Sequence, residues 1–291
     1  MMSVAQAKAL WDRAPSFIDL APAKVAYRRV GEGPPLVLVH GWPFTSYAFR
    51  YVLPALAERF TCILPDLPGL GETEWRPATD FRFAGQAETL RQFVDALALD
   101  RYSMLAFDTG ATIVRQLALI DRDRVSRLVL LNTEIPHHRP PFIELFQTTA
   151  KLPGNATIFR WLLRSRAFRR SRMGFAGCFV DLSRTEGDFH THFVQPLIDS
   201  QHRVEGVMSY LRGIDWALVD GLAKRHAEIE AEVLFVWGAD DPTFPLEHAK
   251  AMCGQLRHCR GIVPIEGARL LVHEEKPAEV TREAIAFLTE A

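Results

Sequence analysis

The stretch Tyr102-Ser103-Met104-Leu105-Ala106-Phe107-Asp108-Thr109-Gly110-Ala111-Thr112-Ile113-Val114-Arg115 decides the fold. An apolar run that is typical of a buried strand passes directly into an amphipathic helix, with Ala106-Phe107-Asp108-Thr109-Gly110 between them. So sharp a turn strains the backbone of its central residue, requires small neighbours and holds the central side chain over the strand end. The helix also points backbone N–H groups at whatever Asp108 attacks. The alternative is that Asp108 only caps this helix, as aspartates often do.

The rest of the chain alternates between strand-like and helix-like patterns. Strand-like runs also occur at residues 24–30, 36–39, 61–64, 125–131, 233–237 and 261–265. Helical patterns occur at residues 47–59, 83–97, 245–256 and 276–288. This alternation predicts an α/β fold whose mostly parallel sheet carries helices on both faces.

Residues 135–229 interrupt this rhythm, because they contain helical patches but no strand-like run. We expect them to form a helical cap over the carboxyl ends of the strands, where open α/β sheets bind ligands. The core would then consist of residues 1–134 and 230–291. Within the cap, residues 160–170 are basic and amphipathic, which suits a membrane or nucleic-acid contact or, more simply, a surface helix.

Composition narrows the classes of partner. The 291 residues carry a net charge of −1, so we expect neither a nucleic-acid partner nor a membrane partner. Cys62, Cys178, Cys253 and Cys259 have no metal-ligand spacing, and we expect four reduced thiols, no metal and no cofactor. The first residues lack the apolar core of a signal peptide, and no apolar run is long enough to span a bilayer. We therefore expect a cytoplasmic protein, and a homodimer stays open.

Three segments carry a family resemblance: His40-Gly41-Trp42-Pro43-Phe44-Thr45-Ser46-Tyr47, Asp66-Leu67-Pro68-Gly69-Leu70-Gly71 and Ala106-Phe107-Asp108-Thr109-Gly110. With these segments in this order, the chain from about residue 24 to residue 288 resembles the α/β-hydrolase fold superfamily. Within it, the chain is similar to the aspartate-nucleophile branch of haloalkane and haloacetate dehalogenases and epoxide hydrolases. The resemblance implies a mostly parallel, eight-stranded sheet flanked by helices, with a helical cap insertion.

The resemblance implies that Asp108 attacks a saturated carbon and forms an ester, which water then hydrolyses. That step needs an oxyanion site, here the backbone N–H groups of Trp42 and Thr109, and a base oriented by a second carboxylate. Asp241 and Glu134 both stand at acid positions, and family position favours Asp241. In this sequence the base is displaced from its usual position.

Leu270 occupies the position at which the family usually has its histidine, and the nearest imidazole is His273. His273 would either act as the base or pack at the start of the last helix. For substrate contacts, the Trp42 indole and the Thr109 hydroxyl could bind a halide. Tyr210 in the cap could protonate an epoxide or simply pack.

We expect hydrolysis of a small apolar molecule through Asp108, dehalogenase-like before epoxide-hydrolase-like. One alternative is a ligand-binding or sensor protein that lacks the base, which the leucine at position 270 suggests. The other is a lyase-type enzyme that uses the same pocket without hydrolysis.

Overall fold

The computed structural model describes residues 2–290. One nine-stranded sheet runs through it in the order β1-β2-β4-β3-β6-β7-β8-β9, with β5 paired to β2. The strands are β1 Ser16–Asp19, β2 Ala23–Val30, β3 Pro35–Val39, β4 Thr61–Pro65, β5 Glu74–Trp75, β6 Tyr102–Ala106, β7 Val125–Leu130, β8 Glu232–Gly238 and β9 Cys259–Ile265.

Neighbouring strands from β4 to β9 are parallel, and β1, β2 and β5 pair antiparallel at one end of the sheet. The mostly parallel sheet is thus confirmed. The sheet has nine strands instead of the eight that the resemblance implies. Seven of them correspond to strand-like runs in the sequence, and the other two are β1 and β5. β1 is mostly exposed and β5 has two residues, so neither shows the apolar run that marks a buried strand.

The helices of the core connect these strands. They are α1 Val4–Lys8, η1 Ala9–Asp12, η2 Ser46–Tyr51, α2 Leu53–Leu56, α3 Phe83–Ala96, α4 Thr109–Ile120, α11 Leu246–Cys253, α12 Val272–Glu275 and α13 Pro277–Thr289. The single helix expected at residues 47–59 is wrong, since the chain forms η2 and then α2. Pro54 lies in the first turn of α2 and lacks the N–H that a continuous helix would need there.

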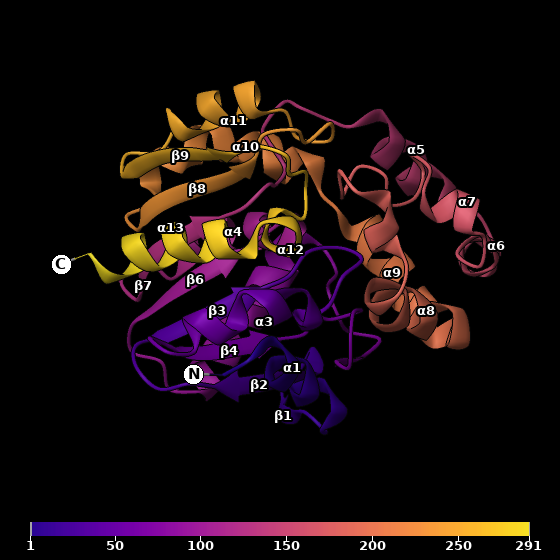
Figure 1. The fold of residues 1–291 in the computed structure, drawn as a ribbon, viewed down its shortest axis with the longest axis horizontal. Coiled ribbons are helices and arrows are strands. Elements are labelled where there is room, and N and C mark those ends of the chain that lie inside the picture. Colours follow the sequence, from indigo (N-terminus) through magenta and orange to yellow (C-terminus); the bar gives the residue numbers. More distant parts are fainter. Residues whose placement is uncertain (1, 291) are drawn as a thin grey trace.

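Residues 135–229, which we call the cap segment, contain no strand in the described structure. Their helices are α5 Pro141–Thr149, α6 Asn155–Leu162, α7 Arg166–Arg169, η3 Leu182–Thr185, η4 His190–Val194, α8 Gln195–Asp199, α9 Gln201–Gly213, α10 Trp216–Arg225 and η5 His226–Glu228. Figure 1 shows α5 to α9 gathered on one side of the molecule, beside the strands of the sheet.

The basic stretch at residues 160–170 makes contacts within the cap segment. Arg160 donates from Nε to the Ile198 carbonyl, and Arg169 forms an ion pair with Glu186 at 2.8 Å. Across residues 2–290, no helix combines the length and the apolar character that crossing a bilayer requires.

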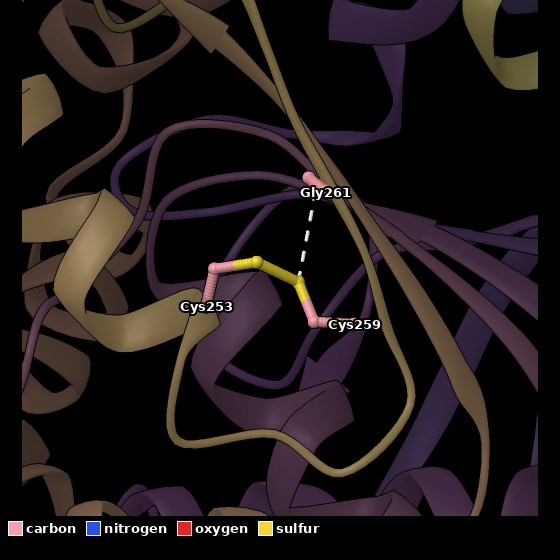
Figure 2. Close-up of a disulfide and its surroundings, with 3 residues drawn as sticks. All are labelled: Cys253, Cys259 and Gly261. Carbon is pink, nitrogen blue, oxygen red and sulfur yellow. Dashed lines mark hydrogen bonds between the residues drawn. A yellow bond between two sulfur atoms is a disulfide. The ribbon is translucent and has the colours of Figure 1, made fainter.

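The expectation of four reduced thiols is wrong for two of the cysteines. Cys253 at the end of α11 and Cys259 at the start of β9 form a disulfide (Figure 2). The turn between them brings their Cα atoms to 5.8 Å, a separation that a disulfide requires and that sequence spacing alone does not reveal. Cys62 and Cys178 are free and buried.

Candidate active site

Asp108 occupies the sharp turn between β6 and α4. Its φ of 51° and ψ of −142° lie outside the regions that most residues adopt. The Asp108 N–H donates to the Asn132 carbonyl at 2.7 Å, and the Thr133 hydroxyl donates to the Asp108 carbonyl at 2.8 Å. The Asp108 side chain makes no capping hydrogen bond, so the alternative that it merely caps α4 is wrong.

The neighbours of this turn must be small. A Cβ atom on Gly41 would lie 2.4 Å from both Cβ and Oδ2 of Asp108, and one on Gly110 would lie 2.3 Å from the His40 carbonyl oxygen. Real Cβ atoms essentially never make contacts this short. The small residues around Asp108 are therefore a steric requirement of the elbow.

Asp108 lines a cavity of about 420 Å³ between the core and the cap segment. The wall is mostly apolar and includes seven phenylalanines: Phe44, Phe142, Phe146, Phe159, Phe168, Phe175 and Phe244. Its acidic residues are Asp108 and Glu134, and its basic residues are Arg172 and Arg269. Such a cavity suits a small, mainly apolar molecule whose reacting atom meets a carboxylate.

The Asp108 carboxylate is buried and incompletely hydrogen-bonded. Its Oδ2 atom has no hydrogen-bond partner within the described chain. Burial raises the pKa of Asp108 well above its usual value, and the nearby charge of Glu134 raises it further. The nearby backbone amides of Thr109 and Trp42 offset part of that rise in pKa. These amides come from the two positions at which the sequence predicts oxyanion donors.

The Thr109 hydroxyl is the centre of a small hydrogen-bond cluster. It accepts from the Trp42 backbone N–H at 2.9 Å and from the Tyr210 hydroxyl at 3.0 Å. The Trp42 indole donates instead to the Val207 carbonyl at 2.9 Å, so it is already used. Trp42 and Thr109 line the cavity, whereas Tyr210 is fully buried behind Thr109 and does not.

Glu134 is held on the cavity wall by hydroxyl groups. Its Oε2 atom accepts from the Thr112 hydroxyl at 2.7 Å and lies 3.0 Å from the Thr133 hydroxyl, whose hydrogen it shares with the Asp108 carbonyl. Arg115 lies behind it and donates from Nη2 to the Glu134 carbonyl and to the Thr112 hydroxyl, both at 2.8 Å. Burial raises the pKa of the Glu134 carboxyl, and Thr112 offsets part of that rise. Burial also lowers the pKa of Arg115 to about 10.

Asp241 has a different environment. Asn132 donates to its Oδ2 at 2.8 Å, and the Thr243 backbone N–H donates to its Oδ1 at 2.7 Å. Burial raises the pKa of Asp241 to about 7. Asp241 does not line the cavity and has no hydrogen bond to a histidine in the described structure. Its bonds fasten the turn that follows β8.

His273 lies in α12 and is fully buried, yet neither ring nitrogen has a hydrogen-bond partner in the described chain. Its ring packs against Phe107 with a centroid distance of 4.3 Å and against Phe49 at 5.7 Å. Burial lowers the pKa of His273 to about 3. The structure does not bring His273 to the cavity; Leu270 lines the cavity instead.

His40 holds the loop that follows β3, as a structural histidine would. Its Nε2 atom accepts from the Leu67 N–H at 2.9 Å, while Nδ1 lies 3.0 Å from the Gly41 carbonyl oxygen. Within residues 2–290 no cluster of three or more His, Cys, Asp or Glu side chains is arranged to hold a metal ion.

Sequence reasoning missed Thr112, Thr133 and Arg115. A signal was present, because Thr112 and Arg115 are three residues apart on α4 and therefore share a helix face. Nothing in the sequence pattern connected that face to Glu134, which follows the neighbouring strand β7.

Comparison with known proteins decides the family. The model of the family described as alpha/beta hydrolase fold matches residues 34–276. The chain belongs to this family.

Among relatives of this α/β hydrolase, a soluble epoxide hydrolase from Corynebacterium sp. (strain C12) is 42% identical over 109 residues, which cover 38% of each chain. Haloalkane dehalogenase 2 from Mycobacterium bovis is 36% identical over 117 residues, 40% of this chain and 41% of that protein. The chain thus matches well under half of the length of either relative. A loop variant of a haloalkane dehalogenase from Bradyrhizobium elkanii has the same fold, with a TM-score of 0.77 at 20% identity over 95% of this chain and 97% of that one.

Proposed function

We propose that this α/β hydrolase converts small apolar electrophiles by attack of Asp108 on a saturated carbon, followed by hydrolysis of the resulting ester. The observation that carries the proposal is the Asp108 carboxylate itself. It stands on a strained elbow, in the wall of an apolar cavity, with one oxygen atom free of hydrogen bonds. A desolvated carboxylate held in this way can form a bond to carbon.

The reaction begins when a carboxylate oxygen of Asp108 donates an electron pair to carbon and the leaving group departs with the bonding pair. The Thr109 backbone amide would bind the oxyanion that forms when water attacks the ester. The Trp42 amide, which donates to the Thr109 hydroxyl in this structure, would have to turn to the oxyanion to take part. Only the ionised carboxylate attacks. Because burial raises the pKa of Asp108, ester formation should slow on acidification well before an ordinary aspartate would be protonated.

Leaving-group chemistry favours haloalkanes over epoxides. A halide departs as an anion and needs no proton, whereas an epoxide oxygen needs an acid as the ring opens. Tyr210, the cap tyrosine considered for that role, is buried behind Thr109 and does not line the cavity. The relatives include proteins named for each activity, which supports this pair of substrate classes.

Rapid chemical quenching tests the proposal. The protein is mixed with bromohexane, bromoacetate or styrene oxide, and the peptide that contains Asp108 is examined by mass spectrometry. We expect an alkyl ester on Asp108 with at least one of these compounds. The Asp108→Asn variant should lose at least about a thousandfold in turnover. Absence of both adduct and turnover with all three compounds would contradict the proposal.

A second candidate function is ligand binding without turnover. It is favoured by Leu270, which lines the cavity at the position where the family resemblance places the base. Saturable binding of hexanol, followed by the fluorescence of the cavity residues Trp42 and Trp216, would support it if bromohexane were recovered unchanged.

A further inference from the structure

Hydrolysis of an ester on Asp108 requires a group that takes a proton from water. Among the described residues that line the cavity, none is a histidine, and the acidic residues are Asp108 and Glu134. Asp108 would be consumed as the ester. Glu134 is then the carboxylate that remains in the cavity wall.

We propose that Glu134 is itself the general base of this site and takes a proton directly from the water that attacks the Asp108 ester. The inference rests on the proposed function, because it needs that ester. It differs from the role expected for Glu134 from the sequence, which was to orient a histidine.

A single hydroxyl group ties Glu134 to the elbow. Thr133 Oγ1 lies 2.8 Å from the Asp108 carbonyl oxygen and 3.0 Å from Glu134 Oε2. Glu134 therefore stands beside the residue that would carry the ester. Asn132 joins Asp108 to Asp241 in turn, since its carbonyl accepts from the Asp108 N–H at 2.7 Å and its side-chain amide donates to Asp241 Oδ2 at 2.8 Å. Asp241, however, does not line the cavity, whereas Glu134 does.

Glu134 is also oriented without an imidazole. The Thr112 hydroxyl fixes Oε2, and Arg115 fixes both that hydroxyl and the Glu134 backbone. Arg115 is fully buried and is held in turn by contacts with His226 Nε2 at 3.2 Å and Met252 Sδ at 3.0 Å. A base positioned by this set of contacts needs no third residue to aim it.

The charges of Asp108 and Glu134 are coupled, and this coupling suits the order of the two steps. The Glu134 charge raises the pKa of Asp108, and electrostatic coupling acts equally in the reverse direction. At the first step one of the two carboxyls can remain protonated while Asp108 attacks. Ester formation then removes the negative charge of Asp108, so Glu134 loses its proton more readily when a base is needed.

The hydrolytic step balances as follows. Glu134 takes one proton from water, and the water oxygen bonds to the ester carbonyl carbon, whose π electrons move to oxygen. The oxyanion re-forms the carbonyl and expels the alkoxide, breaking the bond between the acyl carbon and the alkoxy oxygen. The alkoxide takes the proton from Glu134 and leaves as an alcohol. Asp108 is left as a carboxylic acid, which releases its proton to solvent.

A single-turnover experiment with bromohexane tests this role. In the wild type, the alkyl adduct on Asp108 should form and decay. In Glu134→Gln it should form no more slowly, because loss of the neighbouring charge lowers the pKa of Asp108. Its decay should be at least about 100-fold slower. The matched control Glu144→Gln changes an exposed carboxylate on α5 and should decay at the wild-type rate.

Thr112→Val provides a second readout that keeps the Glu134 carboxylate. Adduct decay should rise with pH as Glu134 ionises. Because the Thr112 hydroxyl lowers the pKa of Glu134, its removal should move this rise to higher pH. The charged or titratable groups that face Glu134 are Asp108 at the elbow, Arg115 on α4 and Tyr210 on α9, and all three are unchanged in this variant.

The outcomes separate the two proposals. An adduct that decays equally fast in Glu134→Gln, or one that persists in the wild type, would overturn the role of Glu134 and leave Asp108 as the nucleophile. An unshifted pH profile in Thr112→Val would overturn it as well, even if Glu134→Gln did not fold. No adduct in any of these proteins would overturn the proposed function and this inference with it.

Discussion

Replacing His273 by leucine should flatten the acid side of the protein's stability curve. The buried ring has a pKa of about 3, compared with the ordinary value of 6.5 that applies when the chain unfolds. As the pH falls below about 6.5, the unfolded chain takes up a proton on this ring and the folded chain does not. Stability is therefore lost progressively between about pH 6.5 and about pH 3.

The magnitude follows from the two pKa values. A pH of about 5 is about 1.5 pH units below the pKa of the His273 ring in the unfolded chain. Each unit corresponds to about 1.4 kcal/mol of unfolding free energy. The wild type should thus lose about 2 kcal/mol between about pH 7.5 and about pH 5 because of His273 alone. Leucine has a similar volume, does not titrate and leaves no unpaired nitrogen atoms in the core.

Urea unfolding of both proteins at the two pH values, followed by tryptophan fluorescence, measures the effect. The loss of unfolding free energy on acidification should be smaller in His273→Leu by about 2 kcal/mol. Contributions from other groups, including His226, are common to both proteins and cancel. Equal losses in the two proteins would refute the reasoning, because they would mean that the ring is hydrated or paired. At neutral pH the variant should also retain its rate of adduct decay, which a catalytic His273 would not allow.

Three further predictions follow from individual contacts. Gly41→Ala places a methyl group 2.4 Å from the Asp108 carboxylate, so adduct formation should fall about 100-fold while the circular dichroism spectrum is kept; an unchanged rate would contradict the steric argument. Glu274 is the buried partner of Arg50, and its two carboxylate oxygens lie 2.6 and 2.8 Å from the guanidinium. Glu274→Ala should therefore lower the unfolding free energy by about 3 kcal/mol. A loss under about 1 kcal/mol would mean that the pair is solvated. Replacing both disulfide cysteines by serine should cost about 2 kcal/mol in urea unfolding, since the bridge closes a short loop, and no change would show that the bridge does not form in solution.

Much of the fold could be predicted because its signals are local. The apolar runs of the parallel strands and the periodicity of α3 each depend on neighbouring residues, and they were located to within about two residues. β5 could not be predicted because a strand of two residues shows no periodicity. The disulfide could not be predicted because it depends on how the turn between Cys253 and Cys259 folds back, and the spacing of the two cysteines does not determine that.

The site could be predicted only where local sequence determines the geometry of a residue. The strained geometry of Asp108 follows from a strand that turns directly into a helix, and it is observed. Which way a side chain faces is a long-range property. The burial of Tyr210 behind Thr109 and the packing of His273 on Phe107 depend on segments far apart in the chain. Sequence motifs therefore identify the segments that lie near Asp108, but they do not identify which side chains of those segments line the cavity.

The elbow has a consequence for how this protein should fail when heated. Asp108 keeps its unusual backbone conformation through hydrogen bonds with Asn132 and Thr133, which follow the end of β7. Slight local loosening there lets residue 108 relax to an ordinary conformation while the sheet beneath stays intact. Thermal inactivation would then set in below the melting temperature, and improving heat tolerance would mean bracing residues 132 and 133 rather than repacking the interior.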